Sequence, residues 1–199
     1  MSDAPNVKDF NASQYTFLDD RDISAIQNPR PMVIVGSHDG RLTGFASIIW
    51  CTPISHDPAL IAFALRDRSY TLNMLLNTRT FSLSFLEANE ESIKIAEFCG
   101  YKSGYNVNKA LTVPHNMVEV RAQDVHTGHV PIVDNALSWM TCRVDSTQRA
   151  GDHTLVIGQV LEAATRSRGT AASPINTPET LLCLHHHIYG EVKLISSNE

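Results

Sequence analysis

The chain has 199 residues, a hydrophobic fraction of 43%, a charged fraction of 19% and a net charge of −5. These proportions are typical of one globular domain with a sizeable core and exclude a disordered chain. The acidic balance and the scattered Lys and Arg residues disfavour a nucleic-acid partner. No apolar run approaches the roughly 20 residues that span a bilayer, and the first residues are polar and acidic, so we expect a cytoplasmic protein.

The first half of the chain predicts several strands and one helix. We expect a single domain over residues 1–199, in which residues 1–28 form a polar lead-in with a short helix around Ser13–Leu18. Met32–Val35 is an apolar strand, and Asp39-Gly40 is a hairpin-type turn. The stretch 42–71 predicts two strands that reverse at His56-Asp57-Pro58. A helix follows with Leu72, Leu75 and Leu76 on one face and Ser69 or Thr71 as its N-cap.

The second half predicts mostly strands. Phe81, Leu83 and Phe85 alternate with Ser82 and Ser84, which predicts a half-buried strand. Residues 87–100 predict a helix that Asn89 caps and Gly100 ends. A polar loop at 101–109 and a Ser-, Thr-, Ala- and Pro-rich loop at 166–178 separate further strands, expected at 117–122, 138–145, 154–162 and 182–189. Many strands and few helices predict a mainly β protein, a closed or split barrel.

An anion site is indicated just before the Leu72 helix. Arg66 and Arg68 supply guanidinium groups, Ser69 and Thr71 supply hydroxyls, and the helix start supplies unpaired N–H groups. The helix dipole favours negative charge at the same place, so this segment could hold a phosphate. The alternative is that Ser69 or Thr71 only caps the helix and that both arginines are solvated.

Several short motifs together resemble the flavin reductase family. They are Pro29-Arg30-Pro31 before an apolar strand, the turn Ser55–Pro58, Arg68-Ser69-Tyr70-Thr71, Ser103-Gly104 with Lys109, and Gly151-Asp152-His153. They occur in the family's order and cover residues 29–192. The resemblance implies an FMN-binding split β-barrel and a homodimer with the pocket near the subunit boundary.

The resemblance also implies a set of site residues. FMN, or else FAD, would lie against the segment 47–52, mainly through its backbone: Ser47, Ile48, Ile49, Trp50, Cys51 and Thr52. Arg68, Ser69, Thr71 and Lys109 would neutralise the flavin phosphate, and Tyr70 and Ser103 would also contact the cofactor. His153 is the catalytic candidate because the matching motif lies where nicotinamide and flavin meet. From the residues alone, the favoured interpretation is that Gly151 and Asp152 form a hairpin turn and His153 only starts the next strand.

The chain departs from the family pattern at two places. Ile48 and Ile49 stand where relatives usually have small or hydroxyl residues beside the flavin. His185, His186 and His187 stand on a strand that usually carries arginine. We do not expect a metal at this triplet or at His126 and His129, because successive strand side chains point to opposite faces.

Other chemistries lack their motifs. There is no G-x-S-x-G, no phosphate-binding Gly-rich loop and no dinucleotide fingerprint. Four separated cysteines, Cys51, Cys99, Cys142 and Cys183, predict buried thiols. Trp139 is assigned to the core, whereas Trp50 could be core or a flavin neighbour.

The favoured hypothesis is an NAD(P)H-dependent flavin reductase, using NADH or NADPH, that could supply reduced flavin to a monooxygenase. It needs no catalytic triad, because the flavin carries the redox chemistry. A flavoredoxin-like electron carrier that does not use NAD(P)H is the main alternative, and a barrel that has lost flavin is the third.

Overall fold

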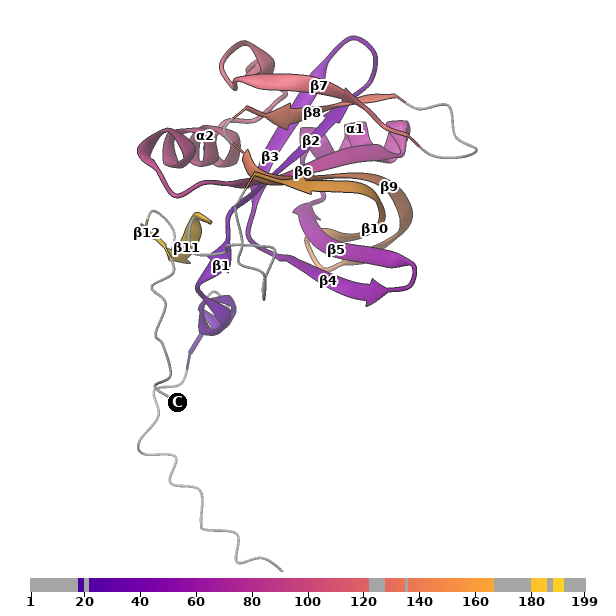
Figure 1. Ribbon diagram of the computed structural model, residues 1–199. Helices are drawn as coiled ribbons and strands as arrows, with labels where there is room; N and C mark the ends of the chain where they lie inside the picture. Colours follow the sequence, from indigo (N-terminus) through magenta and orange to yellow (C-terminus); the bar gives the residue numbers. More distant parts are fainter. Residues whose placement is uncertain are drawn as a thin grey trace, which may run out of the picture.

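Figure 1 shows a computed structural model, which describes residues 18–19, 22–121, 128–134, 136–166, 180–185 and 188–191. The predicted helix around Ser13–Leu18 lies outside the described residues except for Leu18, and the predicted loop 166–178 except for Arg166. The described lead-in contains instead one turn of 3₁₀ helix, η2 (Ile23–Gln27).

Most of the structure is one seven-stranded antiparallel sheet, in the order β3-β2-β6-β9-β10-β5-β4. Its strands are β2 (Val33–His38), β3 (Thr43–Ile48), β4 (Cys51–His56), β5 (Ala59–Arg66), β6 (Thr80–Leu86), β9 (Ala136–Ala150) and β10 (His153–Thr165). Smaller sheets pair β7 (His115–Glu119) with β8 (His129–Val133), and β1 (Arg30–Pro31) with β11 (Leu182–His185) and β12 (Ile188–Gly190). The helices are α1 (Tyr70–Thr78), α2 (Glu90–Tyr101) and the 3₁₀ turn η3 (Lys109–Leu111).

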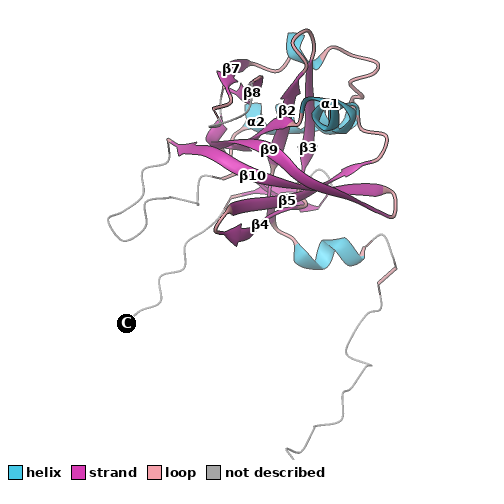
Figure 2. Ribbon diagram, turned by 90° about the vertical axis from the view of Figure 1, so that its right-hand side faces the viewer, coloured by secondary structure: helices cyan, strands magenta, loops and turns pink. Residues whose placement is uncertain are grey.

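The large sheet curls into a split barrel. β3 and β4 lie at opposite edges of the sheet, yet only Ile49 and Trp50 join them. Such a short connection requires the sheet to bend until its two edges come close, and Figure 2 shows this curvature in β9 and β10. Inside the curl, Gly158 of β10 lies so close to the Phe81 ring that a Cβ atom there would overlap it. The predicted mainly β split-barrel fold is confirmed.

Two apolar cores stabilise this arrangement. The first fills the curl and includes Val35, Phe63, Phe81, Leu83 and Val156, with side chains from α1. The second lies between the sheet and α2, where residues such as Ile34, Phe45, Leu86, Ile95 and Val133 pack. The central strands are therefore covered on both faces.

The prediction of a half-buried strand at Phe81–Phe85 is wrong for this reason. Ser82 and Ser84 are fully buried under β8, a strand that the sequence analysis did not predict. Ser82 Oγ donates to the Pro131 carbonyl, and Ser84 Oγ accepts a 3.1 Å hydrogen bond from the Val133 N–H. The serines thus satisfy polar groups of β8 instead of facing water.

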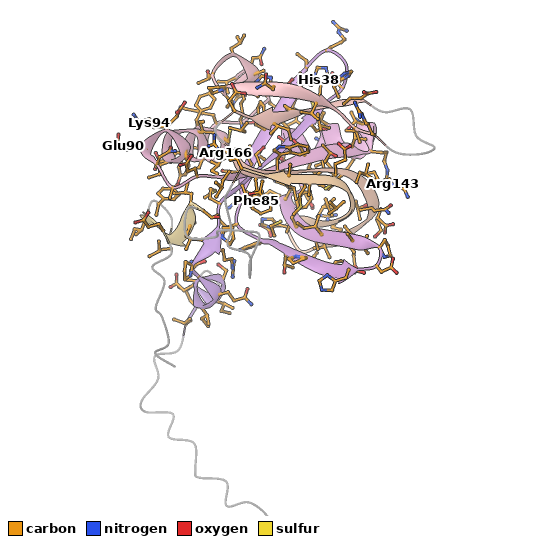
Figure 3. The ribbon with its side chains drawn as sticks, viewed as in Figure 1. His38, Phe85, Glu90, Lys94, Arg143 and Arg166 are labelled. Atoms are coloured by element: carbon orange, nitrogen blue, oxygen red, sulfur yellow. The ribbon has the colours of Figure 1, made fainter. Side chains whose placement is uncertain are left out.

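Both predicted helices form. Ser69 rather than Thr71 caps α1, since its Oγ accepts from the Leu72 N–H at 3.3 Å. Asn89 caps α2 as predicted, but Gly100 does not end this helix, which continues to Tyr101. Glu90 and Lys94 project from the outer face of α2, away from the sheet (Figure 3).

Other predictions need smaller corrections. The single strand expected at 182–189 is two strands, β11 and β12, and Trp139 is half-buried rather than core. The turns at Asp39-Gly40, His56–Pro58 and Gly151-Asp152 each join neighbouring antiparallel strands. None of the four cysteines forms a disulfide, and three are buried while Cys51 is half-buried. Within the described residues, no helix has the length and apolarity needed to cross a membrane.

Candidate functional site

A cleft of about 930 Å³ opens where β3, the end of β5, the start of α1 and the β9–β10 turn meet. This volume lies in the range of small-molecule and cofactor sites. Its lining comes from segments far apart in the chain, namely residues 45–50, 64–66, 68–71, 99–104, 109 and 152–153, with Ser24. This cleft is therefore the candidate for the predicted site.

The helix wall of the cleft consists of Arg66 and residues 68–71. Arg66 and Arg68 are both exposed, so their guanidinium groups can meet a ligand at low desolvation cost. Ser69 Oγ accepts from Leu72, which leaves its own proton to donate. The first N–H groups of α1 have no partners inside the helix and point toward the same end. This wall has the donor set that a phosphate requires.

The strand wall consists of residues 45–50. Among the described strands, β3 pairs only with β2, so its other edge leaves backbone N–H and C=O groups for a ligand. Gly100 of α2 lies against this wall, where a Cβ atom would come within 2.7 Å of Ser47 Oγ. Gly100 thus leaves room for the Ser47 hydroxyl, and the open strand edge suits a flat ligand that hydrogen-bonds to main-chain groups.

Lys109 is the buried cation of the cleft. Its side chain is 4% exposed, and its Nζ donates to the carbonyls of Phe45 at 2.7 Å and Cys99 at 2.6 Å. Burial lowers the pKa of this ammonium from its ordinary value. Lys109 therefore ties the strand wall to the end of α2, and a third N–H remains for a ligand.

The loop after α2 packs on the helix wall. Gly104 lies directly against the Tyr70 ring, and a Cβ atom there would overlap that ring. Tyr105 meets Tyr70 edge-on with ring centroids 5.1 Å apart, and its hydroxyl accepts from Asn73 of α1. These contacts bring Ser103 to the cleft beside the start of α1.

His153 stands at the tip of the β9–β10 hairpin, where Gly151 has a φ of +63°. Its ring lies 4.9 Å from the Trp50 ring, tilted by 44°, and its Nδ1 is 2.7 Å from Asp152 Oδ1. The hydrogen bond from His153 lowers the pKa of the Asp152 carboxyl. Since Nδ1 donates to this carboxylate, Nε2 of the neutral ring is left as an acceptor.

The charge of the cleft is opposite to that of the chain. Among its described lining residues, Arg66, Arg68, Lys102 and Lys109 are cationic and Asp152 is the acidic one, whereas the whole chain carries −5. A local excess of positive charge in an acidic protein concentrates anionic ligands at this cleft.

A smaller cavity of about 250 Å³ continues the cleft past Ser47 and Ile48. It is lined by Asp22 and Glu97 but, within the described residues, by no Lys or Arg. Because carboxylates repel phosphate, the charges of this cavity favour a phosphate less than those of the main cleft do.

Most predicted site residues come together in the cleft. Those that line it are Ser47, Ile48, Ile49, Trp50, Arg68, Ser69, Tyr70, Thr71, Ser103, Lys109 and His153. Cys51 and Thr52 do not: Cys51 packs against the barrel core, which raises its pKa to about 12, and Thr52 is exposed on β4. Arg66, which the sequence analysis placed in the expected anion site but not among the family-implied residues, also lines the cleft. Gly100 and Lys102 line it as well and were not predicted.

A metal site is not formed by the described residues, which contain no group of three or more His, Cys, Asp or Glu placed to hold an ion. The predicted exclusion at His126, His186 and His187 concerns residues outside the described part of the chain.

The curled sheet and its cationic cleft define a split β-barrel, the fold of flavin reductases and FMN-binding proteins. The flavin reductase like domain model matches residues 26–190, so the chain belongs to this family. The FMN-binding protein from Thermus thermophilus with bound 1-cyclohex-2-enone has a TM-score of 0.77 at 22% identity, covering 92% of this chain and 98% of that one. The styrene monooxygenase flavin reductase from Pseudomonas putida S12 has a TM-score of 0.68 at 20% identity, covering 90% and 100%.

Curated relatives match over shorter stretches. An NADH-dependent flavin reductase from Rhodococcus is 28% identical over 109 residues, which cover 55% of this chain and 53% of that protein. A flavin reductase from Pseudomonas putida is 27% identical over 134 residues, covering 67% and 70%. The matched stretch thus spans about half of the Rhodococcus protein, and these likenesses agree with the family without establishing one activity.

Proposed function

We propose that this chain is an NAD(P)H-dependent flavin reductase that holds FMN, or FAD, in the cleft. The observation that carries the proposal is the pairing of a cationic helix N-terminus with an open strand edge in one cleft of an acidic protein. The first suits a phosphate and the second suits a flat ring that hydrogen-bonds to backbone groups.

The residues present fit a flavin phosphate at the helix wall. Arg68 and the Ser69 hydroxyl would form charge-assisted hydrogen bonds to it, with the N–H groups of Tyr70 and Thr71 completing the set. Lys109 would act through its remaining proton, since two are already bonded to carbonyls. Because Lys109 is buried, its ammonium group would meet the ligand nearer the strand wall than the ammonium group of an exposed lysine would.

The ring would lie along the strand wall. Ile48 is 7% exposed and Ile49 is half-buried, so they offer apolar surface and backbone groups rather than side-chain hydrogen bonds. This agrees with a backbone-dominated contact, for which the family's small or hydroxyl side chains are dispensable.

When bound, the flavin supplies the hydride-accepting and electron-carrying chemistry. The chain's own residues would orient the two partners. His153, kept in one tautomer by Asp152, presents Nε2 to a donor group such as a carboxamide N–H of the nicotinamide. Trp50, whose ring touches His153, covers the same part of the cleft and excludes water there.

We also propose a homodimer and a monooxygenase partner. Trp50, which lines the cleft, is 41% exposed, and Ile54 of β4, an edge strand of the described sheet, is 47% exposed, which leaves apolar surface uncovered. A second copy covering it would shield the flavin from water. The styrene monooxygenase reductase is by name a component that serves an oxygenase, and the same role is proposed for this chain.

Absorbance near 450 nm tests the function. The purified protein with FMN is followed under anaerobic conditions before and after NADH, then NADPH. Rapid bleaching by either nucleotide is expected and names the donor. Bound flavin that stays oxidised until dithionite is added would support the flavoredoxin-like carrier, and no flavin binding would overturn both. Light scattering after gel filtration tests the dimer, with a monomer as the opposing result.

A further inference from the structure

Asp67 lies between the two arginines of the helix wall but does not line the cleft. Its carboxylate points instead to the β9–β10 hairpin. Oδ1 accepts from Thr154 Oγ1 at 2.8 Å, and Oδ2 forms an ion pair with Arg149 Nε at 2.9 Å. Its backbone N–H donates to the Asp152 carbonyl at 3.1 Å. Three separate groups of one residue therefore hold a hairpin that is more than 80 positions away in the sequence.

The contacts of Asp67 hold the hairpin close to its turn. Arg149 and Thr154 are directly opposite one another on β9 and β10, so the carboxylate holds both strands at once. The backbone bond holds Asp152, the residue before His153. The ladder between β10 and β5 ends at the pair His153 and Arg66. The backbone bond from Asp67 to Asp152 extends the pairing beyond that end, while the carboxylate reaches back to Thr154 inside it.

The Asp67 side chain is more buried than that of its ion-pair partner. The Asp67 side chain is 26% exposed, against 79% for Arg149. Exposed ion pairs contribute little, but a partly buried carboxylate that accepts a hydroxyl and a guanidinium together is held in one geometry. Loss of the Asp67 contacts would free the tip of the hairpin, whereas the ladder between β10 and β5 would persist.

The tip carries the His153 ring that meets Trp50. Arg66 pairs with His153 in the ladder, Asp152 binds its Nδ1, and Trp50 covers its face, so these groups define its surroundings. The backbone N–H of Asp67 binds the Asp152 carbonyl, and its neighbour Arg68 lines the cleft.

We propose that Asp67 is a positioning residue that sets the His153 tip against the helix wall, and so joins the nicotinamide side of the cleft to its phosphate side. Its kinetic consequence rests on the proposed function; its structural consequence does not.

Fluorescence of Trp50 tests the structural consequence without flavin. Trp139→Phe leaves Trp50 as the remaining tryptophan of the two in the chain. In this background His153→Ala defines the signal of Trp50 without its partner ring. Asp67→Ala is expected to move the wild-type signal more than half-way to that value, and Asp67→Asn less, since its amide oxygen still accepts from Thr154. Asp145→Ala, an exposed aspartate on the same strand β9, is the matched control and should leave the signal unchanged.

Kinetics test the second consequence. Asp67→Ala should raise the KM for the nicotinamide donor about ten-fold, because a small misplacement of a positioning group has effects of this order or larger. FMN affinity should change less than two-fold. A fluorescence signal that stays at the wild-type value overturns the proposal. Parallel loss of FMN affinity and thermal stability also overturns it, since that pattern marks a general folding role.

Thr154→Val provides a milder variant if Asp67→Ala does not fold. It removes one hydrogen bond at the tip and should shift Trp50 fluorescence in the same direction; an unshifted signal counts against the proposal. If the wild-type protein fails to bind flavin, the proposed function fails while the fluorescence comparison still decides the role of Asp67.

Discussion

Both walls of the cleft carry cations, but the cations of the helix wall are exposed and the cation of the strand wall is buried. The helix wall is one continuous segment whose cations, Arg66 and Arg68, are exposed. The strand wall depends on a cation from elsewhere, Lys109, which is 4% exposed and bonded to two carbonyls. An exposed cation can bind a ligand with little loss of stability, whereas a buried cation already forms contacts that stabilise the fold. The difference separates residues that bind from residues that shape the cleft.

Replacing Lys109 should give the largest effect on stability. Lys109→Met keeps the length of the side chain but leaves the Phe45 and Cys99 carbonyls without their donor. We expect a loss of about 3 kcal/mol in the free energy of unfolding, because hydrogen bonds from charged groups contribute about 1.5–3 kcal/mol each. Urea denaturation measures it, and Arg68→Ala, expected within about 0.5 kcal/mol of wild type, is the comparison. Equal losses of unfolding free energy in Lys109→Met and Arg68→Ala would mean that the two cations contribute equally to stability.

Replacing Arg68 and Ser69 together by Ala should give the largest effect on binding. FMN affinity should fall by about 1–3 kcal/mol, through the lost charge-assisted hydrogen bonds to phosphate. Riboflavin, which lacks the phosphate, should bind the variant and the wild type alike in a fluorescence titration.

Two controls accompany this double substitution. Arg143→Ala removes an exposed arginine that bonds to Gln159, away from the cleft (Figure 3), and should leave FMN affinity unchanged. Ser69→Ala alone also removes the N-cap of α1, so unfolding should show a loss of about 1 kcal/mol. Riboflavin affinity falling together with FMN affinity would remove the phosphate assignment.

His153→Ala should act on the donor and not on the flavin. We expect a higher KM for NADH or NADPH, because the contact orients the nicotinamide, and an FMN affinity close to that of wild type. Steady-state kinetics and a flavin titration measure the two quantities. An equal loss of both would assign His153 to folding, and would make the hairpin tip part of the barrel rather than of the site.

The smallest expected effect concerns Asp152. The hydrogen bond from His153 lowers the pKa of its carboxyl, so in His153→Ala this pKa should move up toward the ordinary value of 3.8. With a lowered folded-state pKa, the contact stabilises the protein above the unfolded-state value and is lost as the pH falls through the folded-state value. Carboxyl NMR titration measures the change; an unmoved pKa would show that the ring and carboxylate do not interact in solution.

Much of the fold was predictable because its signals are local. The Ser69 and Asn89 caps and the turns at Asp39-Gly40 and His56–Pro58 each depend on adjacent residues. The buried faces of Ser82 and Ser84 were not predictable from alternation, because alternation identifies two faces but not what covers the second. Here β8 covers it and gives both hydroxyls polar partners.

The candidate site likewise contains residues that the local sequence predicts and residues that it does not. The helix-wall residues Arg68, Ser69 and Thr71 were predictable because cations, cap and helix start follow one another in the chain. The strand-wall segment was proposed only through its family resemblance, and of that segment residues 47–50 line the cleft while Cys51 and Thr52 do not.

The sequence by itself determined most strands of the large sheet, the turns, the Asn89 cap and the cationic segment at 66–71, since these depend on neighbours within a few residues. Only the tertiary structure decided that Lys109 is buried between β3 and α2, that Gly100 packs on Ser47, and that Asp67 holds the tip carrying His153. Such pairings join residues up to 87 positions apart, and they arise when a two-residue link forces the edges of a seven-stranded sheet together. Closure of the barrel, rather than any local pattern, brings the two walls of the cleft to face each other.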